Sequence, residues 1–186
     1  MKKFVTTLAL AGALTLPLAS AYAEGMAPFG TPEDTAFAAQ IWDLMNAKNL
    51  AGDNAIHTQP YEGTDPHGMM LETFYTSGTI NGQTGDLIVK RNYGPQGVSM
   101  DEVQMNPEKH LGAITVMFRR EAGFDPEDQN WFWAKFLPDG TLDKNPKGMA
   151  LAGRVAKGAD AGCIACHSGA PGEDFVFTSD AIGSGN

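Results

Sequence analysis

Two cysteines three residues apart, followed directly by a histidine, constrain this chain more than any other feature. The motif is Cys163-Ile164-Ala165-Cys166-His167, and the sequence holds no further cysteine. In C-x-x-C-H motifs, two thiols one helical turn apart add to the vinyl groups of a haem, and the adjacent histidine binds the iron. The motif therefore predicts one covalently attached c-type haem on Cys163 and Cys166, with His167 as the proximal ligand of the iron.

Cysteine pairs at this spacing also have other roles in proteins. A zinc site needs more ligands than the pair supplies, and the histidines outside the motif are His57, His67 and His110. A thioredoxin-like redox pair normally follows a strand, and no strand pattern leads directly into Cys163. A simple disulfide between Cys163 and Cys166 remains the main alternative to the haem.

The first residues have the pattern of a secretory signal. Lys2 and Lys3 precede an apolar run over residues 4–18, and Ala21-Tyr22-Ala23 offers a cleavage site. A membrane anchor is the alternative, but the run is shorter than the roughly 20 residues that span a bilayer. We therefore expect residues 1–23 to be a signal peptide and the mature protein to lie in the periplasm without a membrane span.

Length and charge limit the architecture and the partners. Residues 24–186 suit a single domain with its own core. The chain has 22 acidic and 13 basic residues, a net charge of −9. Such a surface argues against phosphate backbones, so we expect no nucleic-acid partner. It would also steer a positively charged protein toward the chain, and a soluble redox partner remains open.

An amphipathic helix followed by short strands is the expected order of elements. Thr31-Pro32-Glu33-Asp34 is typical of a helix start, and apolar residues then recur at helical spacing to about Asn49. Residues 52–68 are rich in Gly, Pro, Asp and Asn and predict a long loop. Short runs of β-branched and aromatic residues then predict strands over residues 71–77, 86–93, 113–120 and 131–137.

These elements predict a mostly β fold of the α+β class. We expect a four- or five-stranded antiparallel sheet with the N-terminal amphipathic helix packed on one face. A short helix near the C-terminus would carry the haem. The strand-rich middle excludes the four-helix bundles of cytochrome c′. Small electron-transfer cytochromes have their motif near the mature N-terminus and a later methionine ligand, whereas no methionine follows His167 here.

Several segments together resemble one known family. They are Gly123-Phe124-Asp125-Pro126, Asn130-Trp131-Phe132-Trp133-Ala134-Lys135-Phe136, Pro138-Asp139-Gly140 and the C-x-x-C-H motif. This combination resembles the cytochrome P-460 family, which includes the β-sheet cytochromes called cytochrome c′-beta, over residues 65–180. The resemblance implies an antiparallel β fold, a homodimer and a five-coordinate haem whose open face binds or transforms small nitrogen species.

The resemblance also implies a role for Lys90 at the haem. In hydroxylamine-oxidising members a strand lysine bonds covalently to the haem edge, and Lys90 in Leu87-Ile88-Val89-Lys90-Arg91-Asn92-Tyr93 resembles that position. Strand alternation puts Lys90 on one face with Ile88 and Asn92, opposite Leu87, Val89 and Arg91. The alternative is an ordinary edge-strand lysine in water.

The strand that would line the distal side departs from the oxidising pattern. Those enzymes place a carboxylate above the iron as a proton acceptor, whereas residues 113–118 contain no acid. An apolar distal wall favours neutral diatomic ligands, unless Glu102 or Glu121 reaches in from a loop. Three functions therefore stay open: oxidation of hydroxylamine or nitric oxide by an oxidoreductase of the P-460 type, binding of nitric oxide or similar gases, and plain electron transfer.

Met69 and Met70 are candidate sixth ligands, which an electron carrier would need, although core packing suits them better. His67, alone in a loop, is expected to be a surface or hydrogen-bonding residue. His57 and His110 receive no functional interpretation.

The aromatic strand over residues 131–137 has two faces. Trp131 and Trp133 share one face and are expected in the core, against the helix or at a dimer contact, or else in the haem wall. Phe132 and Phe136 face the other way with the same alternatives. Arg119-Arg120 is interpreted as a solvated strand end, with a haem propionate as the alternative partner.

Overall fold

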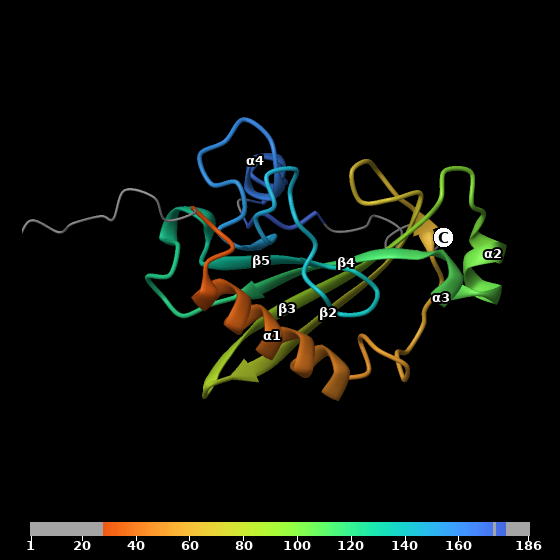
Figure 1. Cartoon of the computed structure of the whole chain (residues 1–186), viewed down its shortest axis with the longest axis horizontal. Helices are drawn as coiled ribbons and strands as arrows, with labels where there is room; N and C mark the ends of the chain where they lie inside the picture. Colours follow the sequence, from red (N-terminus) through yellow and green to blue (C-terminus); the bar gives the residue numbers. More distant parts are fainter. Residues whose placement is uncertain (1–27, 173, 178–186) are drawn as a thin grey trace, which may run out of the picture.

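A six-stranded antiparallel sheet forms the centre of the computed structural model, which describes residues 28–172 and 174–177. The predicted signal peptide, residues 1–23, lies outside this part. The strand order β1-β2-β3-β4-β5-β6 follows the sequence, so every strand pairs with its neighbours along the chain (Figure 1). The strands are β1 Tyr61–Glu62, β2 Met70–Ile80, β3 Gln83–Tyr93, β4 Leu111–Arg119, β5 Trp131–Phe136 and β6 Ala152–Gly153. The helices are α1 Pro32–Ala47, α2 Met100–Met105, α3 Pro107–His110, the 3-10 helix η1 Pro126–Asp128 and α4 Cys163–His167.

The expected mostly β architecture is confirmed, with two differences in detail. The four predicted strands correspond to β2, β3, β4 and β5, and a short helix does carry the cysteine motif. The sheet has six strands, however, because the two-residue strands β1 and β6 extend it on either side. Strand β1 lies inside the segment expected to be a loop, and α2 and α3 were not predicted. No helix among the described residues is long and apolar enough to cross a membrane.

Helix α1 begins where the sequence places it. The Thr31 hydroxyl accepts from the Asp34 amide at 3.1 Å, and the Asp34 carboxylate accepts from the Thr31 amide at 3.1 Å. This reciprocal pair satisfies amides that have no partner within the helix. The helix ends at Ala47, and its buried residues Ala38, Ile41 and Met45 face the sheet.

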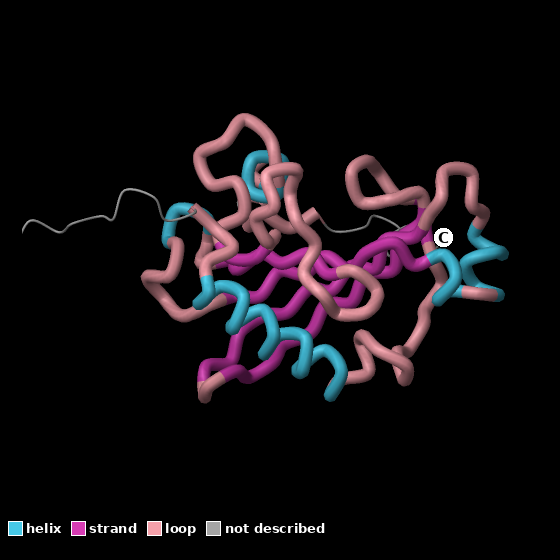
Figure 2. Tube along the Cα trace, viewed as in Figure 1, coloured by secondary structure: helices cyan, strands magenta, loops and turns pink. Residues whose placement is uncertain are grey.

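The sheet separates two hydrophobic clusters, because alternate residues of each strand point to opposite faces. Figures 1 and 2 show α1 on one side of the sheet and α4 with its long connecting loops on the other. The helix-side cluster holds Leu87, Val89, Ile114, Phe118, Phe132 and Phe136 beneath α1. The cluster on the α4 side holds Phe29, Ile88, Met117, Trp131, Trp133, Val155 and Ile164. Trp131 and Trp133 therefore pack away from α1, contrary to one of the expected arrangements, and Phe132 and Phe136 pack beneath it.

A buried polar network on strands β2 and β3 lies beside the segment that follows α1. Glu72 on β2 pairs with Arg91 on β3, both 1% exposed, with 3.3 Å between Oε2 and Nη1. The Arg91 guanidinium also donates to the carbonyls of Leu50, at 2.7 Å, and Ile56, at 2.7 Å. The Tyr93 hydroxyl donates to Glu72, and burial followed by that bond raises the Tyr93 pKa. The network anchors the segment after α1 to the sheet.

Candidate haem site

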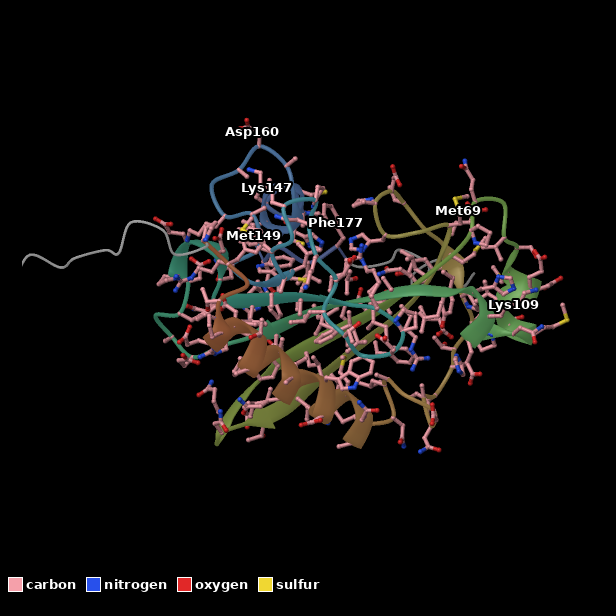
Figure 3. All side chains as sticks on the ribbon, in the orientation of Figure 1. Met69, Lys109, Lys147, Met149, Asp160 and Phe177 are labelled. Atoms are coloured by element: carbon pink, nitrogen blue, oxygen red, sulfur yellow. The ribbon has the colours of Figure 1, made fainter. Side chains whose placement is uncertain are left out.

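A cavity of about 650 Å³ lies between the sheet and α4, on the face away from α1. Its volume falls within the roughly 300–1,000 Å³ that is usual for cofactor sites. Figure 3 shows the labelled residues Lys147, Met149, Asp160 and Phe177 grouped around α4 above the sheet. Strand residues form the floor: Ile88, Lys90, Thr115, Met117, Trp133 and Lys135.

Helix α4 brings the three motif residues to this cavity. Cys163, Cys166 and His167 all line it, and Cys163 and Cys166 are free thiols rather than a disulfide. Cys163 is half-buried and Cys166 is exposed, and burial raises the pKa of the Cys163 thiol. Gly162 precedes the helix at φ 131°, where a Cβ would lie 2.4 Å from the Ala156 Cβ. The backbone in front of the motif therefore requires a glycine.

His167 has the orientation of a metal ligand. Its side chain is 7% exposed, and its Nδ1 lies 2.7 Å from the carbonyl oxygen of Phe175. A ring nitrogen that donates to a backbone carbonyl leaves Nε2 as the coordinating atom, which is the usual arrangement around metal-bound histidines. The rings of Trp133 and Phe177 flank the imidazole, with centroids 4.8 and 5.4 Å away. Burial lowers the His167 pKa, which favours the neutral, ligating form.

Lys90 lies on an interior strand, so its interpretation as an edge-strand lysine is wrong. Strand β3 pairs with β2 on one side and β4 on the other, and Lys90 is in register with Thr115. The side chain is half-buried and lines the cavity, and burial lowers its pKa. Lys135 lines the same floor one strand further on, also in register with Thr115, and forms an ion pair with Asp143 at 2.9 Å.

His67 is a cavity residue that the sequence interpretation missed. It lies in the turn before β2, and its Nδ1 lies 3.3 Å from the Thr115 hydroxyl. The His67 and His167 rings are nearly perpendicular, with centroids 6.0 Å apart. Burial, then the charge of Lys90, lowers the His67 pKa to about 4. A lone histidine in a loop has no periodic signal, so only the folded chain could reveal this position.

Neither of the two methionines considered as sixth ligands lines the cavity, and Met70 has the core-packing role that was expected of it. Met69 is 39% exposed, and in Figure 3 it lies well away from the group around α4. Met70 packs against the small cluster of Tyr93, Val98 and Val103. Neither lines the cavity, whereas Met117 of β4 does.

Acidic side chains are scarce around the cavity, as the sequence of β4 suggests. Glu102 caps α2 through Ser99, and Glu121 pairs with Arg120, so neither reaches the cavity. Among the described residues, Asp160 is the acid that lines it, and this side chain is exposed. The wall is nevertheless not purely apolar, because Lys90, His67 and Thr115 add polar groups to it.

The arginines at the end of β4 are engaged away from the cavity. Arg119 pairs with Asp86 and Asp174 at 3.0 and 2.7 Å and covers the Trp131 ring at 4.0 Å. Arg120 pairs with Glu121. Neither arginine lines the cavity, so the alternative of a haem propionate partner has no support.

The residues present fit a covalently bound haem. The free thiols and the His167 imidazole meet at one largely apolar cavity, which supplies the attachment and ligand chemistry that the motif requires. Trp133 is 3% exposed, and its indole Nε1 has no hydrogen-bond partner among the residues that the structure describes. A buried donor without a partner is unfavourable, so a polar group of a bound cofactor is a natural acceptor.

Comparison with known proteins identifies the family. No curated protein and no solved structure matches the chain. The sequence profile of the cytochrome P-460 family matches residues 69–178, which is more than half of the chain and includes the four long strands and α4. The chain therefore belongs to the cytochrome P-460 family, haem cytochromes that act on small nitrogen compounds.

Proposed function

We propose that this protein is a periplasmic mono-haem c-type cytochrome that oxidises hydroxylamine or nitric oxide. The observation that carries the proposal is the convergence of two free thiols and a carbonyl-oriented imidazole on one cavity of about 650 Å³. The family match supplies the haem and the nitrogen chemistry.

Each motif residue has a defined role in this proposal. Cys163 and Cys166 form thioether bonds to the haem, and His167 Nε2 binds the iron. The haem supplies a redox-active iron with a position for a small ligand. Trp133 and Met117 give the floor of the cavity an apolar surface, and Thr115 and Lys90 provide polar groups beside it.

Oxidation of hydroxylamine needs acceptors for protons and electrons. A soluble redox partner would take the electrons, and the acidic surface suits one that is positively charged. In this proposal the half-buried Lys90, which lines the cavity, forms the covalent bond to the haem edge. The homodimer implied by the family is part of the same proposal.

Reversible binding of nitric oxide or a similar gas is the second candidate function. It is favoured by the absence of acids from the cavity face of β4, where Thr115 and Met117 line the cavity. An oxidase would need another proton acceptor. Plain electron transfer has less support, since neither Met69 nor Met70 lines the cavity.

The test begins with the full chain expressed together with a haem-attachment system. Intact-mass measurement of the periplasmic protein should show cleavage after Ala23 and the added mass of one haem, and a Cys163→Ser/Cys166→Ser variant should lack the covalent haem. Hydroxylamine oxidation with a chemical electron acceptor is then compared among wild type, Lys90→Arg and the exposed control Lys48→Arg.

Turnover that is lost in Lys90→Arg alone, with a red-shifted reduced haem band restored to an ordinary c-type position, would establish the enzyme and the lysine bond. Nitric oxide binding without turnover in any variant would establish the gas-binding function. A protein without haem would refute both.

A further inference from the structure

We propose that Lys157 is a positioning residue of the haem site: three carboxylates hold its ammonium, and this contact sets the distance between the haem on α4 and the floor of the cavity. The inference rests on the haem site proposed above and adds a residue that acts on it from outside the cavity. It also gives a role to residues 123–130, whose two ends belong to the segments that resemble the family.

The loop around η1 presents three carboxylates to one amine. Lys157 Nζ contacts the carboxylate of Asp125 and lies 3.0 Å from Glu127 Oε2 and 3.2 Å from Asp128 Oδ2. The side-chain oxygen of Asn130 accepts from the Asp125 amide at 3.0 Å and so holds the loop in this shape. The loop therefore gathers acids around a cation that comes from another part of the chain.

Two of these carboxylates are buried, so the loop depends on its cation. Asp125 is 2% exposed and Asp128 is 8% exposed, and burial followed by the hydrogen bond with Asp125 raises the Asp128 pKa. Burial alone would lower the Lys157 pKa, but the hydrogen bonds to the three acids raise it above its ordinary value. Removing the ammonium would leave neighbouring buried carboxylates without their counter-ion, which is strongly unfavourable.

Arg154 makes a second contact between the same two segments. Its guanidinium donates to the Phe124 carbonyl and lies 4.7 Å from the centroid of the Phe124 ring. Its Nε also lies 3.8 Å from Asp125 Oδ2. The Lys157 amide donates to the Arg154 carbonyl at 3.1 Å, so the two cations hold both ends of one turn.

This turn is part of the cavity wall and leads into α4. Val155 and Ala156, which lie between the two cations in the sequence, line the cavity. Val155 belongs to the same hydrophobic cluster as Ile164 of α4. A Cβ on Gly162 would lie 2.4 Å from the Ala156 Cβ, so the residue before α4 packs directly against the turn. A shift of the turn therefore moves the start of α4.

The floor of the cavity is held independently of this contact. Thr115 and Trp133 belong to strands paired within the sheet, whereas the haem is attached through α4. The distance between the haem and these floor residues then depends on where α4 lies. Lys157 sets that distance from the outer side of the wall, without touching the haem itself.

Circular dichroism in the Soret band of the holoprotein tests this inference, because the signal depends on how the haem lies relative to nearby aromatic rings such as Trp133. Lys157→Met should change this signal well below the unfolding temperature, and the dissociation rate of nitric oxide should change roughly two- to thirtyfold. Lys157→Arg keeps the charge and should resemble wild type. Lys147→Met makes the same change at an exposed lysine beside α4 and should have neither effect (Figure 3).

Urea unfolding separates positioning from stability. Phe132→Ala should lower stability from the opposite face of the sheet without changing the Soret signal. If Lys157→Met does not fold, Lys157→Gln, which keeps hydrogen-bond donors, takes its place.

A Soret signal and a dissociation rate that match wild type in the Lys157 variant, or equal changes in Lys147→Met, would overturn the inference. If the Soret signal changes in Lys157→Met but no protein binds or oxidises a nitrogen compound, the positioning role stands and the proposed function fails. If wild type acts on nitrogen compounds and Lys157→Met matches it in both readouts, the function stands without the positioning role.

Discussion

Removing the carboxylate of Glu72 should be among the most destabilising single substitutions in this protein. Glu72 and Arg91 are each 1% exposed, and Glu72 accepts hydrogen bonds from the Thr58 amide, at 2.7 Å, and the Tyr93 hydroxyl. Glu72→Ala leaves the Arg91 charge buried without its counter-ion. Breaking a buried pair on one side costs about 3–5 kcal/mol, which for a domain of this size corresponds to a fall in Tm of roughly 6–20 °C.

Urea unfolding of the holoprotein, followed by far-UV circular dichroism, measures this loss. The matched control is Glu121→Ala, which removes the 49% exposed partner of Arg120 and should cost less than about 1 kcal/mol. Glu72→Gln should lie between the two variants, because it keeps the shape and one acceptor. A loss for Glu72→Ala no larger than that of the control would refute the buried-pair reasoning.

Three further expectations follow from the helix cap, the helix-side core and the cavity rim. Thr31→Ala removes the capping hydroxyl of α1 and should lower the free energy of unfolding by about 1 kcal/mol in the same urea assay. Phe132→Ala should cost about 3–5 kcal/mol, because this ring is fully buried under α1, yet it should leave the haem spectrum unchanged. Asp143 is partly buried, which raises its pKa, but the Lys135 ammonium at 2.9 Å brings the pKa below the usual value. Its contribution to stability is therefore present above the unfolded-state pKa and lost as the pH falls through the folded one. Lys135→Met should raise the Asp143 pKa in an NMR titration of the carboxylate, and an unchanged pKa would contradict the pairing.

Patterns that repeat along the chain predicted most of the fold. The Thr31 cap and helical spacing predicted α1, and short runs of β-branched and aromatic residues predicted the four long strands. The strands β1 and β6 were not predicted, because a strand of two residues is too short to show a periodic pattern in the sequence. Strand alternation also placed Lys90 and Arg91 correctly on opposite faces of the sheet. Which of the two faces packs against α1 depends on tertiary packing, which the sequence of a single strand does not specify.

The candidate site was only partly predictable for the same reason. Its motif residues are contiguous in the sequence, so Cys163, Cys166 and His167 could be recognised directly. His67 and Lys135 reach the cavity from a turn and from a strand, through pairing with β4 and the path of the chain before β2. Such convergence arises from tertiary structure and leaves no local pattern.

The separation of the two hydrophobic clusters by the sheet has a consequence for how such a protein can evolve. The helix-side cluster contains 15 of the described buried residues and the cluster on the α4 side contains 7, with none in common. Because neighbouring positions on a strand point to opposite faces, a substitution such as one at Met117 changes the surroundings of the cofactor and leaves the packing of Phe118 beneath α1 in place. Mutations can therefore accumulate on the cavity face at limited loss of stability, and one scaffold can diverge in the ligands it admits and the reactions it carries out.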